Sequence, residues 1–296
     1  MGLTWQETRV LIEHYQRQGS LGRTATLGRN VLWVSRGRLA SLVQDLPGGA
    51  RFVAELPKSQ QYPYADKLFT LLGATEVISF DYSDYEGASV VHDMNFPIPE
   101  HYRESFDFVY DGGSLEHIFN FPQAIKNCMD LLKVGGTFVA STPANNFLGH
   151  GFYQFSPELF FRLFCPENGF RLDRALLFEW GFRGARYEVE DPKNLRRRAE
   201  LWATGGRILL CIEARKVKAH PGELPLLPQQ SDYVSLWGAQ TRTGTNSSFR
   251  KTVRTQADKL FPGLAEFYRG VRDKWHFRLR ERKGLRSDPQ AYKKIP

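Results

Sequence analysis

The segment FDFVYDGGSLEHIFNFPQAIKNCMDLLKVGGTFVASTP, residues 106–143, decides the fold of this chain. It begins with an apolar run that ends on Asp111, which is typical of a buried strand. A polar turn with two glycines follows, and then a helix that Pro122 opens. A second apolar run over 137–142 predicts another strand. A strand, a helix and a further strand in this order predict a pair of parallel strands joined by a crossover helix.

The same alternation extends to both sides of this segment. Helices are expected over 4–18, 64–74, 121–133 and 156–164, and strands over 24–35 (broken at Gly28), 76–81, 88–93, 106–111, 137–142, 170–180 and 205–217. Strands that are apolar almost throughout belong to parallel sheets whose two faces are covered. We therefore predict an α/β fold, with a doubly wound, mostly parallel sheet and helices on both faces.

Bulk composition narrows the class of protein. The chain has 296 residues and is 42% hydrophobic, which suits a globular protein with a full core. It contains neither a membrane-length apolar stretch nor an apolar signal core after its first residues, so we expect it in the cytoplasm. Cys128, Cys165 and Cys211 show no paired spacing and are interpreted as buried thiols in a reducing compartment. No metal site is predicted.

Positive charge is concentrated near the C-terminus. The net charge is +8, and the residues from Arg250 onward contain 14 Lys and Arg but only 5 Asp and Glu. Apolar residues recur at helical intervals from Val253 to Trp275, which predicts a basic helical extension. We expect it to pack on the domain or on a second subunit of a homo-oligomer, with an anionic partner or a membrane surface as the alternative. No specific nucleic-acid motif is present.

These patterns divide the chain into three parts. We expect an N-terminal helix in 1–24, an α/β domain in 25–218 with insertions at about 30–63 and 181–204, and a linker followed by the basic extension in 219–296.

Acidic residues end three consecutive predicted strands. Because parallel strands end at the same edge of a sheet, we expect Asp81, Asp93 and Asp111 to lie along one edge, together with Ser141 and Thr142. Ligands of such sheets bind at this edge, at the carboxyl ends of the strands. The first acid is placed to accept hydrogen bonds from ribose hydroxyls, and the next to reach an adenine. Gly112 and Gly113 would let the backbone approach a ligand closely. For any one of these acids, a plain turn residue is the better interpretation, because Asp is common where a strand gives way to a loop. For the set of three, a ligand site is the better interpretation.

The ordered series of motifs resembles the class I S-adenosylmethionine-dependent methyltransferases. Leu115-Glu116-His117, Leu132-Lys133-Val134-Gly135-Gly136 and Thr142-Pro143 occupy the positions of that family's Leu-Glu-His turn, Leu-Lys-Pro-Gly-Gly turn and Thr-Pro strand end, with Val134 replacing the usual proline. The loop and helix in 147–164 resemble the family's acceptor side. The resemblance covers about 64–170 and implies a Rossmann-like fold and S-adenosylmethionine as cofactor.

The resemblance also implies roles for individual residues. The expected cofactor contacts are Gly28, Asp81, Asp93, Met94, Asp111, Gly112 and Gly113. His117 and His150 are candidate general bases, needed only if the acceptor must lose a proton, and Tyr153 is a further catalytic candidate. Asn145, Asn146 and Gln154 are candidate acceptor contacts. For His117, a hydrogen bond within its own turn is an equally good interpretation.

One departure from the family concerns the first strand. The family's glycine-rich loop is reduced here to Thr26-Leu27-Gly28-Arg29, and Gly28 lies much further from Asp81 than the roughly 20 residues usual for such a loop. An insertion, a differently built cofactor site or a loss of cofactor binding would each explain this.

Three functions remain open from the sequence. The first is methyl transfer to a small-molecule acceptor, such as a sugar or glycan intermediate. The second is a non-catalytic binding or scaffold protein of the same fold that uses the basic extension. The third is a nicotinamide-dependent oxidoreductase, which the absence of a GxGxxG motif disfavours.

Overall fold

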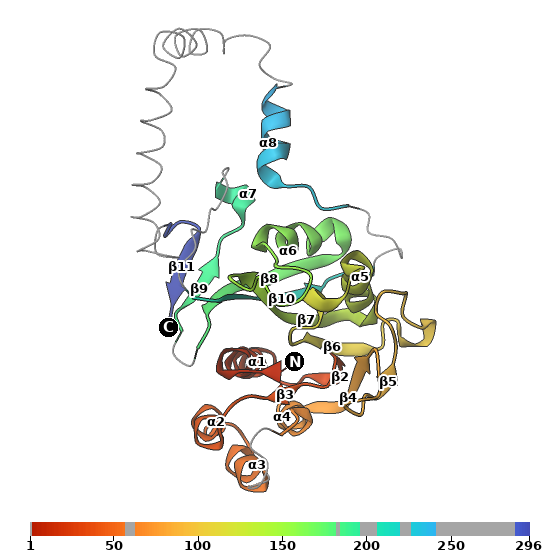
Figure 1. The fold of residues 1–296 in the computed structure, drawn as a ribbon, viewed down its shortest axis with the longest axis vertical. Coiled ribbons are helices and arrows are strands. Elements are labelled where there is room, and N and C mark those ends of the chain that lie inside the picture. Colours follow the sequence, from red (N-terminus) through yellow and green to blue (C-terminus); the bar gives the residue numbers. More distant parts are fainter. Residues whose placement is uncertain (1, 57–62, 182–183, 196–205, 220–225, 241–287) are drawn as a thin grey trace.

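A nine-stranded mixed sheet forms the centre of the molecule (Figure 1). The computed structural model describes residues 2–56, 63–181, 184–195, 206–219, 226–240 and 288–296. In spatial order the strands are β11 (Tyr292–Ile295), β9 (Arg186–Val189), β8 (Phe170–Glu179), β10 (Ile208–Lys216), β7 (Leu132–Asn145), β6 (Phe106–Asp111), β2 (Gly22–Leu27), β4 (Ala74–Asp81) and β5 (Val90–Val91).

The connectivity is that of a doubly wound sheet. From β2 the chain steps outward through β4 to β5 and then returns to β6 on the other side of β2, all in parallel. This reversal beside β2 creates the crevice in which such sheets bind ligands. The predicted fold class is therefore confirmed for the core. Beyond β7 the sheet is mixed, because β10 runs antiparallel to both β7 and β8.

Helices cover both faces of the sheet, as predicted (Figure 1). One face carries α1 (Trp5–Gln18), α2 (Arg36–Val43), α3 (Gly49–Glu55) and α4 (Asp66–Leu71), and the other carries α5 (Phe121–Leu131) and α6 (Pro157–Leu163). Strand β6 is apolar almost throughout because both of its faces are covered: Phe106 and Val109 belong to one hydrophobic core, while Phe108 and Tyr110 belong to the other.

Local sequence signals fix the helix starts. The backbone N–H of Thr4 donates to the Glu7 carboxylate at 3.1 Å, which completes the predicted capping box of α1. Ser156 caps α6 by accepting a hydrogen bond from the Glu158 N–H at 3.3 Å.

Three predicted strands differ most from the structure. The strand expected over 88–93 is reduced to β5, because Asp93 turns the chain by accepting the Asn95 N–H at 2.9 Å. Strand β7 is longer than 137–142, since β10 pairs along it up to the Ile208–Asn145 pair. The strand expected over 24–35 divides at Gly28 into β2 and β3 (Val31–Leu32), which leaves the main sheet to pair with β1 (Gly2–Leu3).

The two expected insertions contain short elements. The first, between β2 and α4, holds β3, α2 and α3, and the second holds β9 and α7 (Pro192–Leu195). The predicted helix from Val253 to Trp275 lies outside the described residues. The expected C-terminal extension contains α8 (Ser231–Gln240). Residues 292–295, expected as part of a helical extension, instead form β11, which pairs antiparallel with β9.

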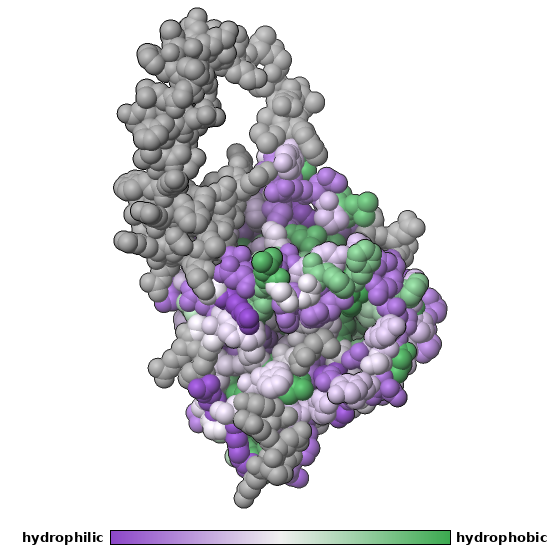
Figure 2. Space-filling model, viewed as in Figure 1, coloured by the Kyte–Doolittle hydropathy of each residue, from purple (hydrophilic) through white to green (hydrophobic). Residues whose placement is uncertain are grey.

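The surface shown in Figure 2 is largely hydrophilic, with hydrophobic residues in separate patches. Within the described ranges, no helix has the length and apolar character needed to cross a bilayer.

Candidate functional site

Two neighbouring cavities lie at the carboxyl ends of β2, β4, β6 and β7. The first, here called the β4–β5 cavity, has a volume of about 310 Å³ and is lined by residues that include Gly28, Asp81, Asp93, Met94, Ser114 and His117. The second, here called the histidine cavity, has a volume of about 240 Å³ and is lined by residues that include Gly112, Gly113, Glu116, His117, Ser141 and His150. His117 lines both cavities and so marks their junction.

The β4–β5 cavity brings together four of the residues expected to contact a cofactor. Asp81 ends β4 and is partly exposed to the cavity, and its backbone carbonyl accepts the His92 N–H at 2.7 Å. Asp93 also faces the cavity, although one of its carboxylate oxygens is engaged by Asn95. Met94 is 6% exposed and joins the cavity wall to the core. The cavity thus offers two carboxylates above an apolar wall.

The glycine turn after β6 belongs to the histidine cavity. Gly113 adopts a φ of +100°, in the region that favours glycine. At Gly112 the reason for glycine is different, because a Cβ there would lie 2.2 Å from Oδ1 of Asn30. The space beside Gly112 is therefore filled by the buried side chain of Asn30, from the turn after β2. Gly112 also lines the histidine cavity, and its expected contact with a cofactor stays a prediction.

Asp111 lies in neither cavity. It is fully buried, and its Oδ1 accepts the Ser114 N–H at 2.7 Å. Burial raises the pKa of Asp111 to about 6, against the hydrogen bonds from Ser114 that lower it. Asp111 holds the turn that positions Glu116 and His117, while its predicted contact with a cofactor stays a prediction.

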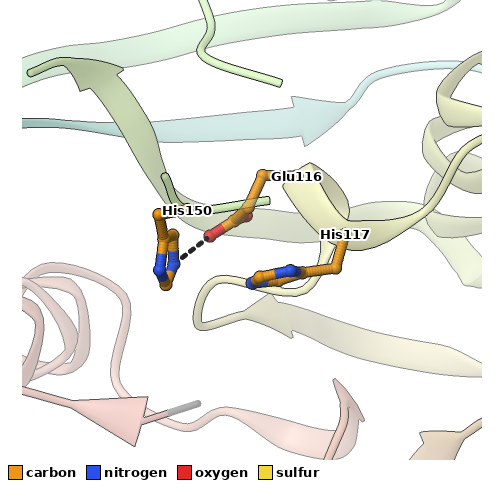
Figure 3. Close-up of side chains that lie close together, drawn as sticks. All are labelled: Glu116, His117 and His150. Carbon is orange, nitrogen blue, oxygen red and sulfur yellow. Dashed lines mark ion pairs between the residues drawn. The ribbon is translucent and has the colours of Figure 1, made fainter. Parts of the chain in front are cut away.

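Three side chains converge at the junction of the cavities (Figure 3). Glu116 and His117 come from a short 3₁₀ helix, Leu115–His117, and His150 comes from the loop after β7. Nε2 of His150 lies 3.6 Å from Oε1 of Glu116, and the two imidazole rings are 4.9 Å apart between centroids. The loop is fixed to Glu116, whose carbonyl accepts the Phe152 N–H at 2.7 Å. Thus both predicted histidines share one site.

The pKa values of Glu116 and His117 are shifted from their ordinary values. Burial, together with the nearby negative charge of Asp111 as the second cause, raises the pKa of Glu116 to about 8. Burial also lowers the pKa of His117, with the charge of His150 as the second cause. Groups shifted in this way at a cavity are typical of functional sites. Sequence reasoning assigned no role to Glu116, although the Leu-Glu-His turn that contains it was the signal available.

The predicted acceptor contacts lie elsewhere in the same loop. Tyr153 donates from its hydroxyl to the Phe119 carbonyl at 2.7 Å, and Gln154 accepts the Phe147 N–H at 2.9 Å. Asn146 adopts a φ of 62° and donates to the Gly206 carbonyl at 2.5 Å. None of these three residues, nor Asn145, lines either described cavity. The described contacts shape the loop, and an acceptor role for these residues remains a prediction.

Other residues of the histidine cavity were not predicted. Glu7 reaches it from α1 and accepts the Ser141 hydroxyl at 2.9 Å, and Arg207 places its guanidinium over the ring of Phe147 at 5.4 Å. Trp33 and Trp180, each about half exposed, complete its aromatic wall. Glu7 comes from α1, Trp33 from the first insertion, and Trp180 and Arg207 from the positions that flank the second insertion. Only the three-dimensional fold brings these segments together.

The reduced glycine loop has a defined structure. Gly28 has a φ of +66°, and its N–H donates to the Phe80 carbonyl at 2.7 Å. Arg29 turns to Asp66, at 3.2 Å, and lies over the ring of Tyr64 at 4.0 Å. Asn30 donates to the Gly28 carbonyl at 3.1 Å, and its buried Oδ1 has no hydrogen-bond partner within the described ranges. The side chain of Arg29 is therefore not part of the lining of the β4–β5 cavity.

Comparison with known proteins adds similarity in fold alone. No protein-family model matches the chain, and no curated protein matches its sequence. A candidate methyltransferase of Bacillus halodurans aligns at 14% identity over 71% of this chain and 99% of that one, with a TM-score of 0.39.

Two further solved structures align equally weakly. A Burkholderia thailandensis 1,6-didemethyltoxoflavin N1-methyltransferase, with bound 1,6-didemethyltoxoflavin and S-adenosylhomocysteine, aligns at 14% identity over 71% and 78% of the two chains, with a TM-score of 0.38. A candidate zinc-dependent alcohol dehydrogenase of Rhodobacter sphaeroides aligns at 12% over 73% and 90%, with a TM-score of 0.38. The chain has a distant structural similarity to class I S-adenosylmethionine-dependent methyltransferases.

Proposed function

We propose that this protein transfers a methyl group from S-adenosylmethionine to a small-molecule acceptor. The observation that carries the proposal is the pair of adjoining cavities at the switch of strand order, one with Asp81 and the other with His150, which meet at His117. A donor in one cavity and an acceptor in the other could bring their reacting atoms together at the junction, and methyl transfer requires such an in-line approach.

The residues present fit the nucleoside part of the cofactor. The carboxylate of Asp81 stands at the end of the strand next to β2, where a ribose is held in doubly wound sheets. Asp93 and Met94 extend the cavity toward β5, with a polar group and an apolar surface for a base. Oδ1 of Asn30, beneath the turn after β2, is buried and has no hydrogen-bond partner among the described residues, so it would accept a hydrogen bond from a donor group that reached this turn.

The histidine cavity supports the acceptor assignment. Its aromatic wall of Trp33, Phe147 and Trp180, with the charged groups Glu7 and Arg207, suits a polar ring. A sugar or glycan intermediate meets this description. S-adenosylmethionine would supply an activated methyl group, and the protein's own residues orient the acceptor and exclude water. An imidazole at the junction would take the proton of a hydroxyl or amine acceptor.

A non-catalytic scaffold is the alternative, and the reduced glycine loop favours it. Titration calorimetry with S-adenosylmethionine and S-adenosylhomocysteine, with NADH as the control, separates the two. Micromolar binding of the first two ligands but not of NADH supports methyl transfer. No binding of either leaves the scaffold as the better account, and binding of NADH alone supports an oxidoreductase.

A further inference from the structure

We propose that Glu116, His117 and His150 bind a divalent transition-metal ion, of which Zn²⁺ is the best match. Each residue offers one ligand atom, and these atoms all lie within 4.8 Å of one another (Figure 3). In a tetrahedral zinc site, with bonds of about 2.0–2.2 Å, ligand atoms are roughly 3.3 Å apart. The 3.6 Å between Glu116 and His150 is already close to this separation.

The ligand atoms must move closer together to bind an ion, and the two exposed histidines can make this movement. His150 has 53% of its side chain exposed, and His117 is also exposed, so both imidazoles can rotate by a side-chain torsion without disturbing the core. Glu116 is the fixed ligand, since 2% of its side chain is exposed and its turn is hydrogen-bonded to Ser114 and Phe152. One rigid carboxylate and two movable imidazoles can therefore close around an ion.

A positive charge beside Glu116 would stabilise its buried carboxylate. Oε2 of Glu116 has no hydrogen-bond partner in the described part of the chain, and the same holds for Oδ2 of the neighbouring Asp111. A buried carboxylate without a partner is costly, and a coordinated cation removes that cost. The described ion pairs include none between Glu116 and a lysine or arginine; its only described partner is His150.

The ligand types select the kind of metal. Two imidazole nitrogens and one carboxylate oxygen suit zinc and its transition-metal neighbours, whereas magnesium and calcium prefer oxygen ligands throughout. Three protein ligands leave a fourth position open, as in catalytic rather than structural zinc sites. That position faces the cavities, because all three residues line the histidine cavity.

A consequence for catalysis rests on the proposed function. If the histidine cavity holds the acceptor, an acceptor oxygen could complete the coordination, and the metal would lower the pKa of that hydroxyl. The two histidines would then hold the ion instead of acting as the general base, and the proton of the acceptor hydroxyl would pass to water. Metal binding itself needs no S-adenosylmethionine, so it can be measured separately.

The test is a calorimetric titration of chelator-treated, full-length protein with Zn²⁺ alone, repeated with His150→Ala and Glu116→Gln. We expect one ion per chain, with a Kd at least about tenfold higher in each variant. His101→Ala is the matched control, since this exposed histidine lines neither cavity and its ring packs at a tilt against that of Tyr102, 4.1 Å between centroids. Its Kd should equal that of the wild type.

The exposed position of His150 keeps the test valid even if Glu116→Gln fails to fold. Equal zinc affinity of His150→Ala and wild type would overturn the proposal, because the ion would then bind elsewhere. Absence of zinc binding by the wild-type protein would overturn it as well. Neither result bears on binding of S-adenosylmethionine, so failure of the metal site and failure of the proposed function remain distinguishable.

Discussion

Oδ1 of Asn30 occupies the space in which Gly112 would carry a side chain, 2.2 Å from an ideal Cβ position. This contact joins the turn after β2 to the turn after β6, the two strands that flank the switch of chain direction. The side chain of Asn30 also holds the Gly28 carbonyl. One buried amide therefore sets the spacing of both turns that support the proposed site.

Gly112→Ala should destabilise the protein, because the new methyl group has no room beside Asn30. Overpacking of this kind costs about 1–3 kcal/mol, which urea denaturation can measure. Gly149→Ala is the control, since a Cβ at that position meets nothing within 4 Å. Adding Asn30→Ala should reduce the cost of Gly112→Ala. Equal costs with and without Asn30 would show that the two residues are not coupled.

Asp81→Ala should weaken binding of S-adenosylmethionine without lowering the melting temperature. Hydrogen bonds to a charged group contribute about 1.5–3 kcal/mol, so we expect a Kd about 10- to 100-fold higher. Asp84→Ala, an exposed acid three residues further on and outside the β4–β5 cavity, is the matched control. Unchanged affinity in Asp81→Ala would remove this residue from the site.

Glu13 should make folding stability depend on pH in the acid range. Burial raises its pKa, but hydrogen bonds and charges from Arg186 and Arg174 outweigh burial and lower the pKa to about 2. Because the folded pKa lies below the unfolded value of 4.5, the stabilisation is complete above pH 4.5 and is lost as the pH falls toward 2.

The magnitude follows from the size of this shift. A depression from 4.5 to about 2 corresponds to about 3 kcal/mol of unfolding free energy near pH 7. Glu13→Gln should lose about this amount at pH 7 and progressively less below pH 4.5. Glu76→Gln removes a half-exposed ion pair with Arg23 and should cost less than about 1 kcal/mol. A pH-independent loss in Glu13→Gln would contradict the assignment.

Gln154→Ala should loosen the loop that carries His150. The Gln154 side chain accepts the Phe147 N–H, so its removal should speed hydrogen exchange at that amide. Gln18→Ala, at an exposed position at the end of α1, should leave the exchange unchanged. Unaltered exchange in Gln154→Ala would show that other contacts hold the loop.

The core of the fold could be predicted because its sequence signals are local. Each core element can be identified from its own residues, independently of the rest of the chain. Examples are the apolar strand 106–111, the helix that Pro122 opens, and the helices capped at Thr4 and Ser156. The edge elements could not be predicted in this way. Strand β11 exists through its pairing with β9, about 100 residues earlier in the chain, and this pairing leaves no local pattern.

Part of the candidate site could also be predicted from local sequence signals. Strand-end residues such as Asp81 and Asp93 meet because parallel strands end at one edge. His117 and His150 were identified, but their convergence on Glu116 depends on how the loop after β7 folds back. The contacts of Gly112 with Asn30 and of Asp111 with Ser114 could not be predicted from the sequence, because they depend on how the turns after β2 and β6 meet. The cofactor contacts expected of Gly112 and Asp111 stay predictions.

The crystal structure of the complex with S-adenosylhomocysteine tests the central claim most directly. We predict the nucleoside in the β4–β5 cavity, with a ribose hydroxyl within hydrogen-bonding distance of the Asp81 carboxylate and the sulfur atom directed toward His117. A nucleoside bound away from the ends of β2, β4 and β5, or crystals soaked to saturation that contain no ligand, would contradict the proposal that these two cavities hold a methyl donor and its acceptor.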